Sequence, residues 1–531
     1  MSQLNVYIPG AALPPHGKSW NTYLWQAGLT LLFLNAMGAA TLTVGGSGAP
    51  CPNAQYTTIG AAVTAASPGD VIDICPALYP EQLIITKPLT LHGIPVGGVQ
   101  RVLLQPTLTD LQNLATEAVI TVMNTSDVTI QGLAIDASHN AVSGCTPFLA
   151  GIHFLNASGT VENSSISGAQ LTTSTGCKNN LPFGNGFGVK IEATQPAAAS
   201  YQVSVVQNSI HDFTTNGVLA TGAGVNAQIQ GNTISGVGPS GGTFQFGIFI
   251  ALGPTAQITR NMITEGLCGA LSVSDCIGLR SEGITLRAIG DGTVVDSNII
   301  MNAQSGIFIN GANKAQITNN TISNIDAMSG MDIQGTASGA FTNSVIQGNT
   351  ISNVGPIDQN ASLDEEGCGI NEYSGTGVSG NTILSNTVND AYCGVAYVTA
   401  DPVQLGTYSN TLYTELNEDL YPNSFPPAME PPASAAPSGM VTTASALPKN
   451  VTVTTPEITL DGTGSTSADG KPLTFMWSIP QGSPSAAILK GNSATPTVQF
   501  GQPGLYKFQL TVTDSSGTSA SDVASVDFLG N

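Results

Sequence analysis

The chain has 531 residues, enough for more than one domain, and only 9% of them are charged. Asp and Glu outnumber Lys and Arg by 34 to 13, so the formal net charge is −21 at pH 7. This balance argues against nucleic acid as a partner, because phosphate binding relies on basic surface. It also disfavours direct capture of a polyanionic sugar, unless divalent cations bridge the two negative surfaces.

Residues 1–44 carry the pattern of an export signal. Leu24–Val44 is largely apolar, follows Lys18 and contains small residues up to Ala40. This pattern predicts a signal peptide cleaved after Ala40, and therefore a secreted, periplasmic or cell-surface protein. The long, weakly basic start also fits an uncleaved N-terminal anchor. No second apolar stretch of this length follows, which argues against multi-pass membrane insertion.

A short helix and a strand are predicted after the leader. The segment Tyr56–Ser67 places four apolar residues on one helical face: Ile59, Ala62, Val63 and Ala66. Pro68 and Gly69 then end the helix, and Val71–Ile74 reads as a strand.

Most of the remaining chain repeats a short phrase: Asn, a small polar residue, Ile, then Ser or Thr. Copies begin at Asn163, Asn208, Asn232, Asn261, Asn298, Asn320, Asn349, Asn381 and Asn410. The intervals run from 22 residues (298 to 320) to 45 residues (163 to 208). Between most copies, Gly precedes alternating apolar residues, as in Gly247–Ile250. The pattern predicts a solenoid of parallel strands stacked about 4.8 Å apart, with the Asn side chains forming a ladder.

With these repeats the chain resembles the right-handed parallel β-helix superfamily, which includes pectate-lyase-like enzymes. The resemblance covers roughly residues 50–412 and implies an all-β fold, with the solenoid spanning residues 45–415. It also implies that the predicted helix covers the open N-terminal end of the solenoid, where bare strand edges would aggregate. We expect a monomer, since capped solenoids are commonly monomeric. The superfamily contains lyases, hydrolases, esterases, epimerases and surface proteins, so it implies no single activity.

All eight cysteines lie within the predicted solenoid, and an even number in an exported chain favours disulfides. The spacing suggests four pairs: Cys51–Cys75 around the helix, Cys268–Cys276 across a short loop, Cys368–Cys393 between stacked strands, and Cys145–Cys177 by elimination. Strands one coil apart satisfy the Cα separation of a disulfide. Two stacked buried thiols are the alternative for Cys368 and Cys393.

The C-terminal part has a different composition. Residues 416–445 are rich in Pro, Ala and Ser and are typical of a stiff linker. Residues 446–531 alternate short strands and turns around Trp477, as in a small β-sandwich. Its Leu460–Ser465 turn and its Leu510–Asp514 strand resemble PKD-like immunoglobulin-fold domains, which implies a spacer or contact module of an extracellular protein. Asp461 and Asp469 could hold Ca²⁺, although turn formation is the commoner use of such aspartates.

A candidate site follows from the repeat. Residues two positions after each Gly should face outward as one column: His153, Lys190, Leu219, Phe249, Thr285, Phe308, Asp332 and Asn371. Those two positions later form a second column: Leu155, Glu192, Thr221, Ala251, Arg287, Asn310, Gln334 and Tyr373. This register assumes no bulge, because a slip of one residue would turn every side chain inward.

His153, Lys190 and Glu192 should therefore cluster on adjacent coils. Lys190 or His153 would serve as the base of a polysaccharide lyase acting by β-elimination, with Glu192, Arg287 and Asp332 as further candidate catalytic groups. Exposed aromatic side chains would stack against sugars of an extracellular polysaccharide or surface glycan: Phe249, Phe308 and Tyr373. The alternatives are a solvated Lys–Glu pair and a Phe column beneath a long loop.

Other signals are weak. No cofactor is evident; Ca²⁺ at residues 364–366 is a further option, though this acidic loop lacks the spacing of a calcium motif. The Asn-Thr-Asp, Asp-Asp, Gly-His-Gly and Arg-Ile-Lys elements of β-helix polygalacturonases are absent. The rival hypothesis is a non-catalytic, adhesive surface scaffold with a PKD-like contact module. The scarcity of ionisable residues on the predicted faces supports it.

Overall fold

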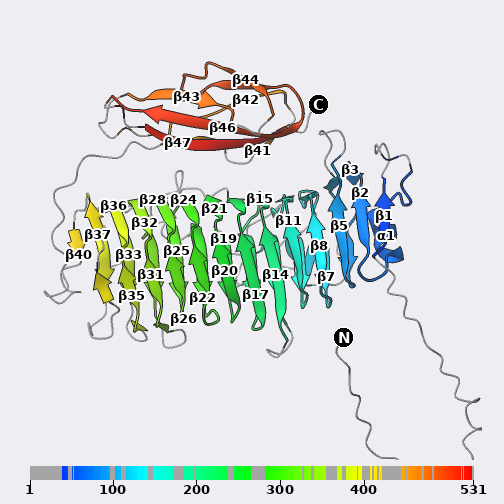
Figure 1. Cartoon of the computed structure of the whole chain (residues 1–531), viewed down its shortest axis with the longest axis horizontal. Coiled ribbons are helices and arrows are strands. Elements are labelled where there is room, and N and C mark those ends of the chain that lie inside the picture. Colours follow the sequence, from blue (N-terminus) through cyan, green and yellow to red (C-terminus); the bar gives the residue numbers. More distant parts are fainter. Residues whose placement is uncertain are drawn as a thin grey trace, which may run out of the picture. The chain divides into compact units, whose positions relative to one another are not determined.

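Three long parallel sheets form the solenoid (Figure 1). The computed structural model describes residues 39–528, except 46–50, 52, 96–101, 109–114, 141–146, 172–184, 195–198, 237–243, 265–280, 326–327, 336–339, 355–366, 374–377, 392, 398–406, 410–411, 415–417, 421–443, 449–450, 454, 466, 468–471, 481–483, 516 and 518. The leader at residues 1–38 and most of the Pro-rich linker lie outside this range.

Each coil contributes one strand to each sheet, and each strand pairs in parallel with its counterpart in the next coil. Sheet A has 13 strands: β1 (Thr41–Val44), β2 (Val71–Ile74), β5 (Leu89–Gly93), β8 (Val128–Gln131), β11 (Gly159–Glu162), β14 (Tyr201–Val206), β17 (Val225–Gln230), β20 (Thr255–Thr259), β23 (Val294–Asp296), β27 (Gln316–Thr318), β31 (Val345–Gln347), β35 (Thr382–Leu384) and β38 (Thr407–Ser409). Because β1 pairs with β2, the solenoid starts at Thr41 rather than at the predicted residue 45.

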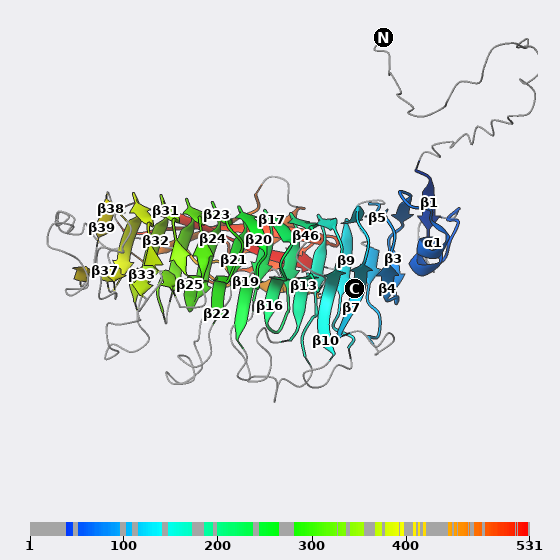
Figure 2. The same ribbon diagram turned by 90° about the horizontal axis from the view of Figure 1, so that it is seen from below.

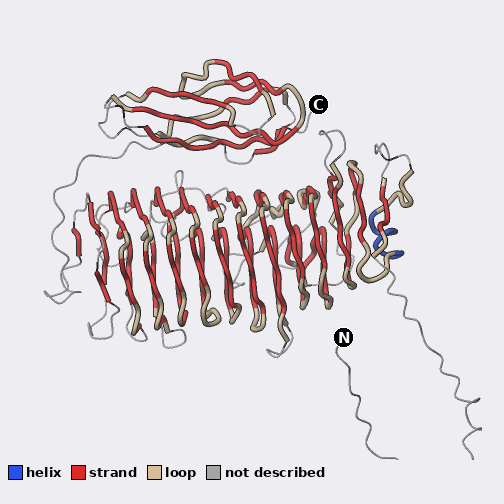
Figure 3. The backbone as a smooth tube through the Cα atoms, in the orientation of Figure 1, coloured by secondary structure: helices blue, strands red, loops and turns tan. Residues whose placement is uncertain are grey.

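Sheet B follows sheet A in every coil and has 12 strands: β3 (Ala77–Tyr79), β6 (Val102–Leu104), β9 (Leu133–Asp136), β12 (Ser165–Ser167), β15 (Ser209–His211), β18 (Thr233–Ser235), β21 (Met262–Thr264), β24 (Ile299–Ala303), β28 (Thr321–Ile325), β32 (Thr350–Val354), β36 (Thr387–Ala391) and β39 (Leu412–Thr414). These short strands are red segments of the tube in Figure 3. Each strand from β12 to β36 turns at least one Ile or Val into the core.

Sheet C completes each coil, also with 12 strands: β4 (Leu83–Ile85), β7 (Thr116–Met123), β10 (Phe148–Leu155), β13 (Phe187–Glu192), β16 (Asn216–Thr221), β19 (Gln245–Ala251), β22 (Ser281–Arg287), β25 (Ser305–Asn310), β29 (Met331–Gln334), β33 (Cys368–Tyr373), β37 (Cys393–Tyr397) and β40 (Glu418–Leu420). The solenoid therefore extends past the predicted boundary at residue 415. A minor three-stranded sheet lines a turn: β26 (Ala312–Asn313), β30 (Phe341–Thr342) and β34 (Val378–Ser379). Figure 2 shows the coils following one another in chain order.

Glycine sets the distance between sheets B and C. A Cβ placed on Gly283 of β22 would lie 2.4 Å from Ile300 Cγ2 and 2.8 Å from the Gly306 carbonyl oxygen. No side chain fits there, because real Cβ atoms do not approach other atoms this closely. The same collision would occur in neighbouring coils at Gly151, Gly188, Gly217, Gly306, Gly330 and Gly369. Gly at the start of these seven sheet C strands is thus a packing requirement.

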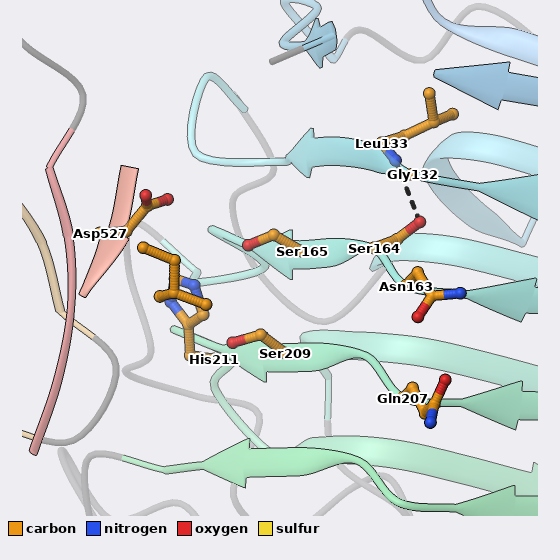
Figure 4. A pocket seen from close by; sticks show the side chains of 10 residues that line it. Gly132, Leu133, Asn163, Ser164, Ser165, Gln207, Ser209, His211 and Asp527 are labelled. Atoms are coloured by element: carbon orange, nitrogen blue, oxygen red, sulfur yellow. Dashed lines mark hydrogen bonds between the residues drawn. The ribbon is translucent and has the colours of Figure 1, made fainter. Parts of the chain in front are cut away.

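A buried asparagine ladder runs before the sheet B strands, as the sequence predicts. Each amide Nδ2 donates to the Oδ1 of the next coil at 2.9–3.1 Å, through Asn208, Asn232, Asn261, Asn298, Asn320, Asn349 and Asn386. Two predicted members are wrong. Ser164, not Asn163, occupies the first position, where its hydroxyl accepts from the Leu133 N–H (Figure 4). Asn381 precedes a sheet A strand instead, and Asn410 lies outside the described residues.

The N-terminal end is covered by α1 (Ile59–Ala65), which packs Ile59, Ala62 and Val63 into the core. Both oxygens of the Glu81 carboxylate accept from the first backbone N–H groups of this helix, at 2.8 Å. A disulfide joins Cys51 to Cys75. These contacts confirm the predicted helical cap.

The C-terminal domain is a small sandwich, described by itself. One sheet contains β41 (Val451–Val453), β47 (Ser519–Phe528), β46 (Gly504–Thr513) and β43 (Thr474–Ser478); the other contains β42 (Glu457–Thr459), β45 (Thr497–Phe500) and β44 (Ala486–Leu489). Trp477 belongs to the core and donates to the Ser493 carbonyl at 3.1 Å. The Asp461 carboxylate accepts from the Thr463 N–H and hydroxyl, which is a turn-forming use. The all-β prediction of a parallel solenoid followed by a sandwich is confirmed.

Candidate functional site

The outer face of sheet C has the register that the sequence predicts. The first column runs through His153, Lys190, Leu219, Phe249, Thr285, Phe308, Asp332 and Asn371. The second runs through Leu155, Glu192, Thr221, Ala251, Arg287, Asn310, Gln334 and Tyr373. A one-residue slip would have destroyed both columns, so no bulge interrupts these strands at either column.

A third outer column was missed by the sequence interpretation. Residues immediately before the repeat Gly stack on one another: Ala150, Phe187, Asn216, Phe246, Glu282 and Ser305. Ala150, Phe187 and Phe246 pack with Leu219 and Phe249 in a cluster separate from the solenoid core. The residue directly after this Gly, such as Ile152, Val189 or Ile284, faces the solenoid core, so the residue before the Gly and the residue two positions after it both lie on the outer face. The break in strict alternation at each Gly is the signal that could have revealed this column.

The outer aromatic side chains are buried, which contradicts their predicted exposure. Phe249 is 1% exposed and Phe308 is 2% exposed. The Phe246 ring lies 4.9 Å from that of Phe249, and the exposed Arg287 guanidinium lies 5.6 Å from Phe249 and 5.1 Å from Phe308. The Arg287 guanidinium therefore covers the ring faces of Phe249 and Phe308 that were expected to stack against sugars. The side chain of Tyr373 lies outside the described set.

Three of the predicted catalytic residues meet in one place, which we call the Lys190 cluster: His153, Lys190 and Glu192, with Thr116 from β7. The Lys190 Nζ donates to Glu192 Oε2 at 2.9 Å and to Thr116 Oγ1 at 3.0 Å. The His153 Nε2 lies 3.2 Å from the same Glu192 oxygen. Nothing in the sequence links Thr116 to this cluster, because Thr116 precedes the clear repeats.

Two further aromatic residues surround this cluster. Lys190 Nζ lies 4.6 Å from the ring centre of Phe148 and 5.8 Å from that of Phe187. Lys190 and His153 are almost fully buried, whereas the Glu192 side chain is 26% exposed. The predicted alternative of a solvated Lys–Glu pair is therefore wrong. A buried ion pair with charge-assisted hydrogen bonds is strongly held in one geometry.

Burial and charge both shift the titration of these groups. Burial lowers the pKa of the His153 imidazole, and the neighbouring Lys190 charge adds to this effect. Burial likewise lowers the pKa of the Lys190 ammonium, against the raising effect of Glu192. Burial would raise the pKa of the Glu192 carboxyl, but its hydrogen bonds to His153 and Lys190 and the Lys190 charge outweigh burial and lower it to about 2. At neutral pH the carboxylate is thus ionised and the imidazole neutral.

These protonation states determine which imidazole nitrogen carries the proton. An ionised carboxylate only accepts hydrogen bonds, so the nitrogen facing Glu192, Nε2, must be the donor. The other nitrogen, Nδ1, then carries a lone pair, and this buried atom has no hydrogen-bond partner. A neutral imidazole oriented by a carboxylate, with its basic nitrogen unoccupied, is the arrangement of a general base.

The remaining predicted residues lie elsewhere on the same face. Arg287 is on β22 and Asp332 on β29, whereas Lys190 is on β13, so the five predicted catalytic residues do not form one site. Glu282, which was not predicted, is fully buried and accepts a hydrogen bond from the Thr285 hydroxyl. Three long connections of the solenoid lead into this sheet: residues 168–186, 265–280 and 355–367. Functional groups concentrate where variable loops meet a rigid scaffold.

Among the residues that the structure describes, no group of three His, Cys, Asp or Glu side chains could hold a metal ion. The acidic residues 364–366, Asp469 and the pairs Cys145–Cys177 and Cys268–Cys276 lie outside the described residues. Cys368 is disulfide-bonded, and its register neighbour in β37 is Cys393. The described part of the chain also contains no helix with the length and apolar character needed to span a bilayer.

The Lys190 cluster should make folding stability sensitive to acid. The pKa of Glu192 falls from 4.5 to about 2 in the folded protein, so its stabilising contribution is present above pH 4.5 and lost as the pH falls to about 2. The lowered pKa of His153 acts in the same direction below pH 6.5. Glu192→Gln should therefore flatten the acid limb of stability, by up to about 3 kcal/mol relative to wild type.

Urea unfolding of both proteins between pH 5 and 2.5 measures this difference. Asp291→Asn is the matched control, because Asp291 forms an exposed 3.5 Å pair with Lys314. Equal pH slopes in wild type and Glu192→Gln would refute the assigned protonation states.

The family described as right handed beta helix region matches residues 112–326 and 282–412, and a PKD domain family matches residues 448–527. Both predicted domain resemblances are thereby confirmed. No curated protein matches the chain.

Solved structures of diverse proteins are similar to the solenoid. A lacto-N-biosidase of GH136 from Eubacterium ramulus has 10% identity and a TM-score of 0.43, over 72% of this chain and 68% of that one. PfbA, a surface adhesin of Streptococcus pneumoniae, has 12% identity and a TM-score of 0.37, over 68% and 87%. The A-module of the mannuronan C-5 epimerase AlgE4 from Azotobacter vinelandii has 14% identity and a TM-score of 0.36, over 66% and 94%.

Proposed function

The chain belongs to the right handed beta helix region family, and from that premise we propose that it binds an acidic carbohydrate on sheet C and removes a proton from it. The observation that carries this proposal is the His153 imidazole, whose Nε2 is oriented by Glu192 while Nδ1 is unoccupied. The proposed reaction is β-elimination on a uronate-containing polysaccharide.

In this reaction His153 Nδ1 takes the proton from C5 of a uronate, which lies next to the carboxylate carbon. The electron pair of the C5–H bond forms the C4=C5 double bond, the C4–O4 bond breaks, and O4 leaves with a proton from water. The Lys190 ammonium stabilises the negative charge that develops on the uronate carboxylate. Glu192 positions both groups through its 2.9 Å and 3.2 Å contacts. The leader pattern and the PKD domain support a secreted, periplasmic or surface location for this chemistry.

A panel of polysaccharides tests the proposal. Purified protein would be incubated with uronate-containing polymers and with neutral polymers, with and without Ca²⁺, because the net charge of −21 disfavours anionic substrates in the absence of cations. We expect absorbance at about 235 nm to rise with one uronate polymer, since proton abstraction with loss of O4 leaves an unsaturated sugar. Absence of unsaturated product from every uronate polymer, in folded protein, would refute the lyase assignment.

Burial of the cluster favours a second candidate function. His153 is 2% exposed and Lys190 is 4% exposed, so a polymer cannot reach Nδ1 without movement of the surrounding chain. A non-catalytic surface scaffold would retain such a cluster for rigidity alone. Glycan binding that yields no unsaturated product, and that is unchanged in His153→Gln, would favour the scaffold.

A further inference from the structure

A second part of the sheet C face contains a polar group that the fold leaves unsatisfied. The Asn371 side chain on β33 is fully buried, and neither its Oδ1 nor its Nδ2 has a hydrogen-bond partner. Leaving a buried polar group without a partner costs about 1–3 kcal/mol. Such a group points to a ligand that supplies the missing hydrogen bonds.

The surroundings of Asn371 identify the chemistry of that ligand. Asp332 is its register neighbour and is 1% exposed, and Phe308 is the register neighbour of Asp332 on the preceding coil. We call these three residues the Asn371 subsite. Glu282 and Thr285 lie on β22, which pairs with the strand of Phe308. The subsite thus combines an amide that donates and accepts, a carboxylate that accepts, and an aromatic ring.

A neutral sugar has the matching groups. Its hydroxyls donate to the Asp332 carboxylate, and they both donate to and accept from the Asn371 amide. Phe308 bounds the subsite, but Arg287 already covers its ring face, so recognition rests on the two polar side chains. A uronate is disfavoured, because its carboxylate would meet the Asp332 carboxyl group in a buried, low-dielectric setting. We propose that the Asn371 subsite binds a neutral, hydroxyl-bearing sugar unit.

The position of the subsite deepens the proposed function, on which this step depends. Asp332 lies five coils beyond Lys190 in the strand order of sheet C, which corresponds to about 24 Å along the solenoid. The two sites differ in composition: the Lys190 cluster offers an ammonium and a neutral imidazole beside Glu192, whereas the Asn371 subsite offers Asp332 and an uncharged amide. A substrate that occupies both would carry an acidic unit at the Lys190 cluster and a neutral unit at the Asn371 subsite.

Calorimetric titration with four neutral hexasaccharides tests the subsite: cellohexaose, xylohexaose, mannohexaose and galactohexaose. We expect one of them to bind the wild type. It should bind Asn371→Leu at least about tenfold more weakly, because the sugar hydroxyls lose the amide that pairs with them. The Asn226→Leu variant is the matched control, since Asn226 is exposed on β17 in sheet A. Without ligand, Asn371→Leu should melt at or above the wild-type temperature, because it removes an unpaired buried amide.

The outcomes separate the two proposals. Lys190→Met should retain binding of the neutral sugar while losing elimination, so either site can fail alone. If none of the four sugars binds, or if Asn371→Leu binds as tightly as wild type, the subsite is refuted. A large drop in melting temperature for Asn371→Leu, but not for Asn226→Leu, would assign the amide a structural role and also overturn the proposal.

Discussion

Replacing His153 by glutamine should lower kcat/KM for uronate elimination by about 100- to 10,000-fold, the usual contribution of a positioned general base. Glutamine retains a polar side chain that can face Glu192, but it has no basic nitrogen in place of Nδ1. The loss should appear in kcat, because proton abstraction occurs only in the chemical step. Initial rates at about 235 nm measure it, under the conditions in which wild type is active.

A second histidine–carboxylate pair supplies the control. His92 Nδ1 lies 2.9 Å from Asp73 Oδ1 on sheet A, away from sheet C, and both side chains are partly exposed. His92→Gln should leave kcat/KM unchanged. In wild type, activity should fall as acid protonates His153, at a pH below the ordinary imidazole value of 6.5, because burial lowers this pKa. Wild-type activity in His153→Gln would exclude this residue as the base.

Replacing Asn298 by leucine should destabilise the solenoid by about 3–6 kcal/mol, because it leaves several buried polar groups unpaired. The Asn298 Nδ2 donates to the Ile258 carbonyl and to Asn320, and its Oδ1 accepts from the backbone N–H and side chain of Asn261. Leucine has nearly the same volume but supplies none of these four hydrogen bonds. The effect should therefore arise from hydrogen bonding and not from a cavity.

Thermal and urea unfolding, followed by circular dichroism, measure this loss. Asn226→Leu is again the control, and an exposed strand position should change stability by less than about 0.5 kcal/mol. If Asn298→Leu unfolds with wild-type midpoints, the ladder sets the register of the coils but does not stabilise them. Local opening of the coils around β24 without a global shift would likewise reduce the predicted size of the effect.

The outer columns of sheet C could be predicted because the Gly before each strand is a steric requirement. Gly283 meets Ile300 of the opposite sheet, so no other residue fits, and the position marks the register in the coils that carry this Gly. This is why His153, Lys190 and Glu192 could be placed together from sequence. The column of residues before each Gly was missed because the alternation was counted only from the Gly onward. Glu282 belongs to that column and was therefore not predicted.

The ladder was predicted well in its centre and badly at its ends, for a local reason. The phrase Asn-Thr-Ile occurs both before sheet B strands, as at Asn349, and before a sheet A strand, as at Asn381. Sequence alone does not distinguish these two turns, since both end in a strand with one inward Ile. At the first position of the ladder, Asn163 adopts a positive φ of 50°, and Ser164 takes over the buried hydrogen bonds.

Burial of the outer face could not be predicted from the repeat. Periodicity determines whether Phe249 or Lys190 faces the core or the outside, but it carries no information about what lies over the outer face. The pKa directions of His153 and Lys190 depend on that burial, and so does the choice of His153 Nδ1 over Lys190 as base. The chemistry of this face thus depends on burial by segments that are distant in sequence, which the repeat pattern does not encode.

Because the coils stack at a constant spacing, distances along the solenoid can change only in steps of one coil. Removing one whole coil between β13 and β29 would bring Lys190 and Asp332 closer by a single step of about 4.8 Å and leave the local contacts of each unchanged. Removing part of a coil would instead break the glycine contacts between sheets B and C. Length variants of this protein should therefore differ by complete coils. Under the proposed function, each variant would fit a glycan with a different number of sugar units between its two sites.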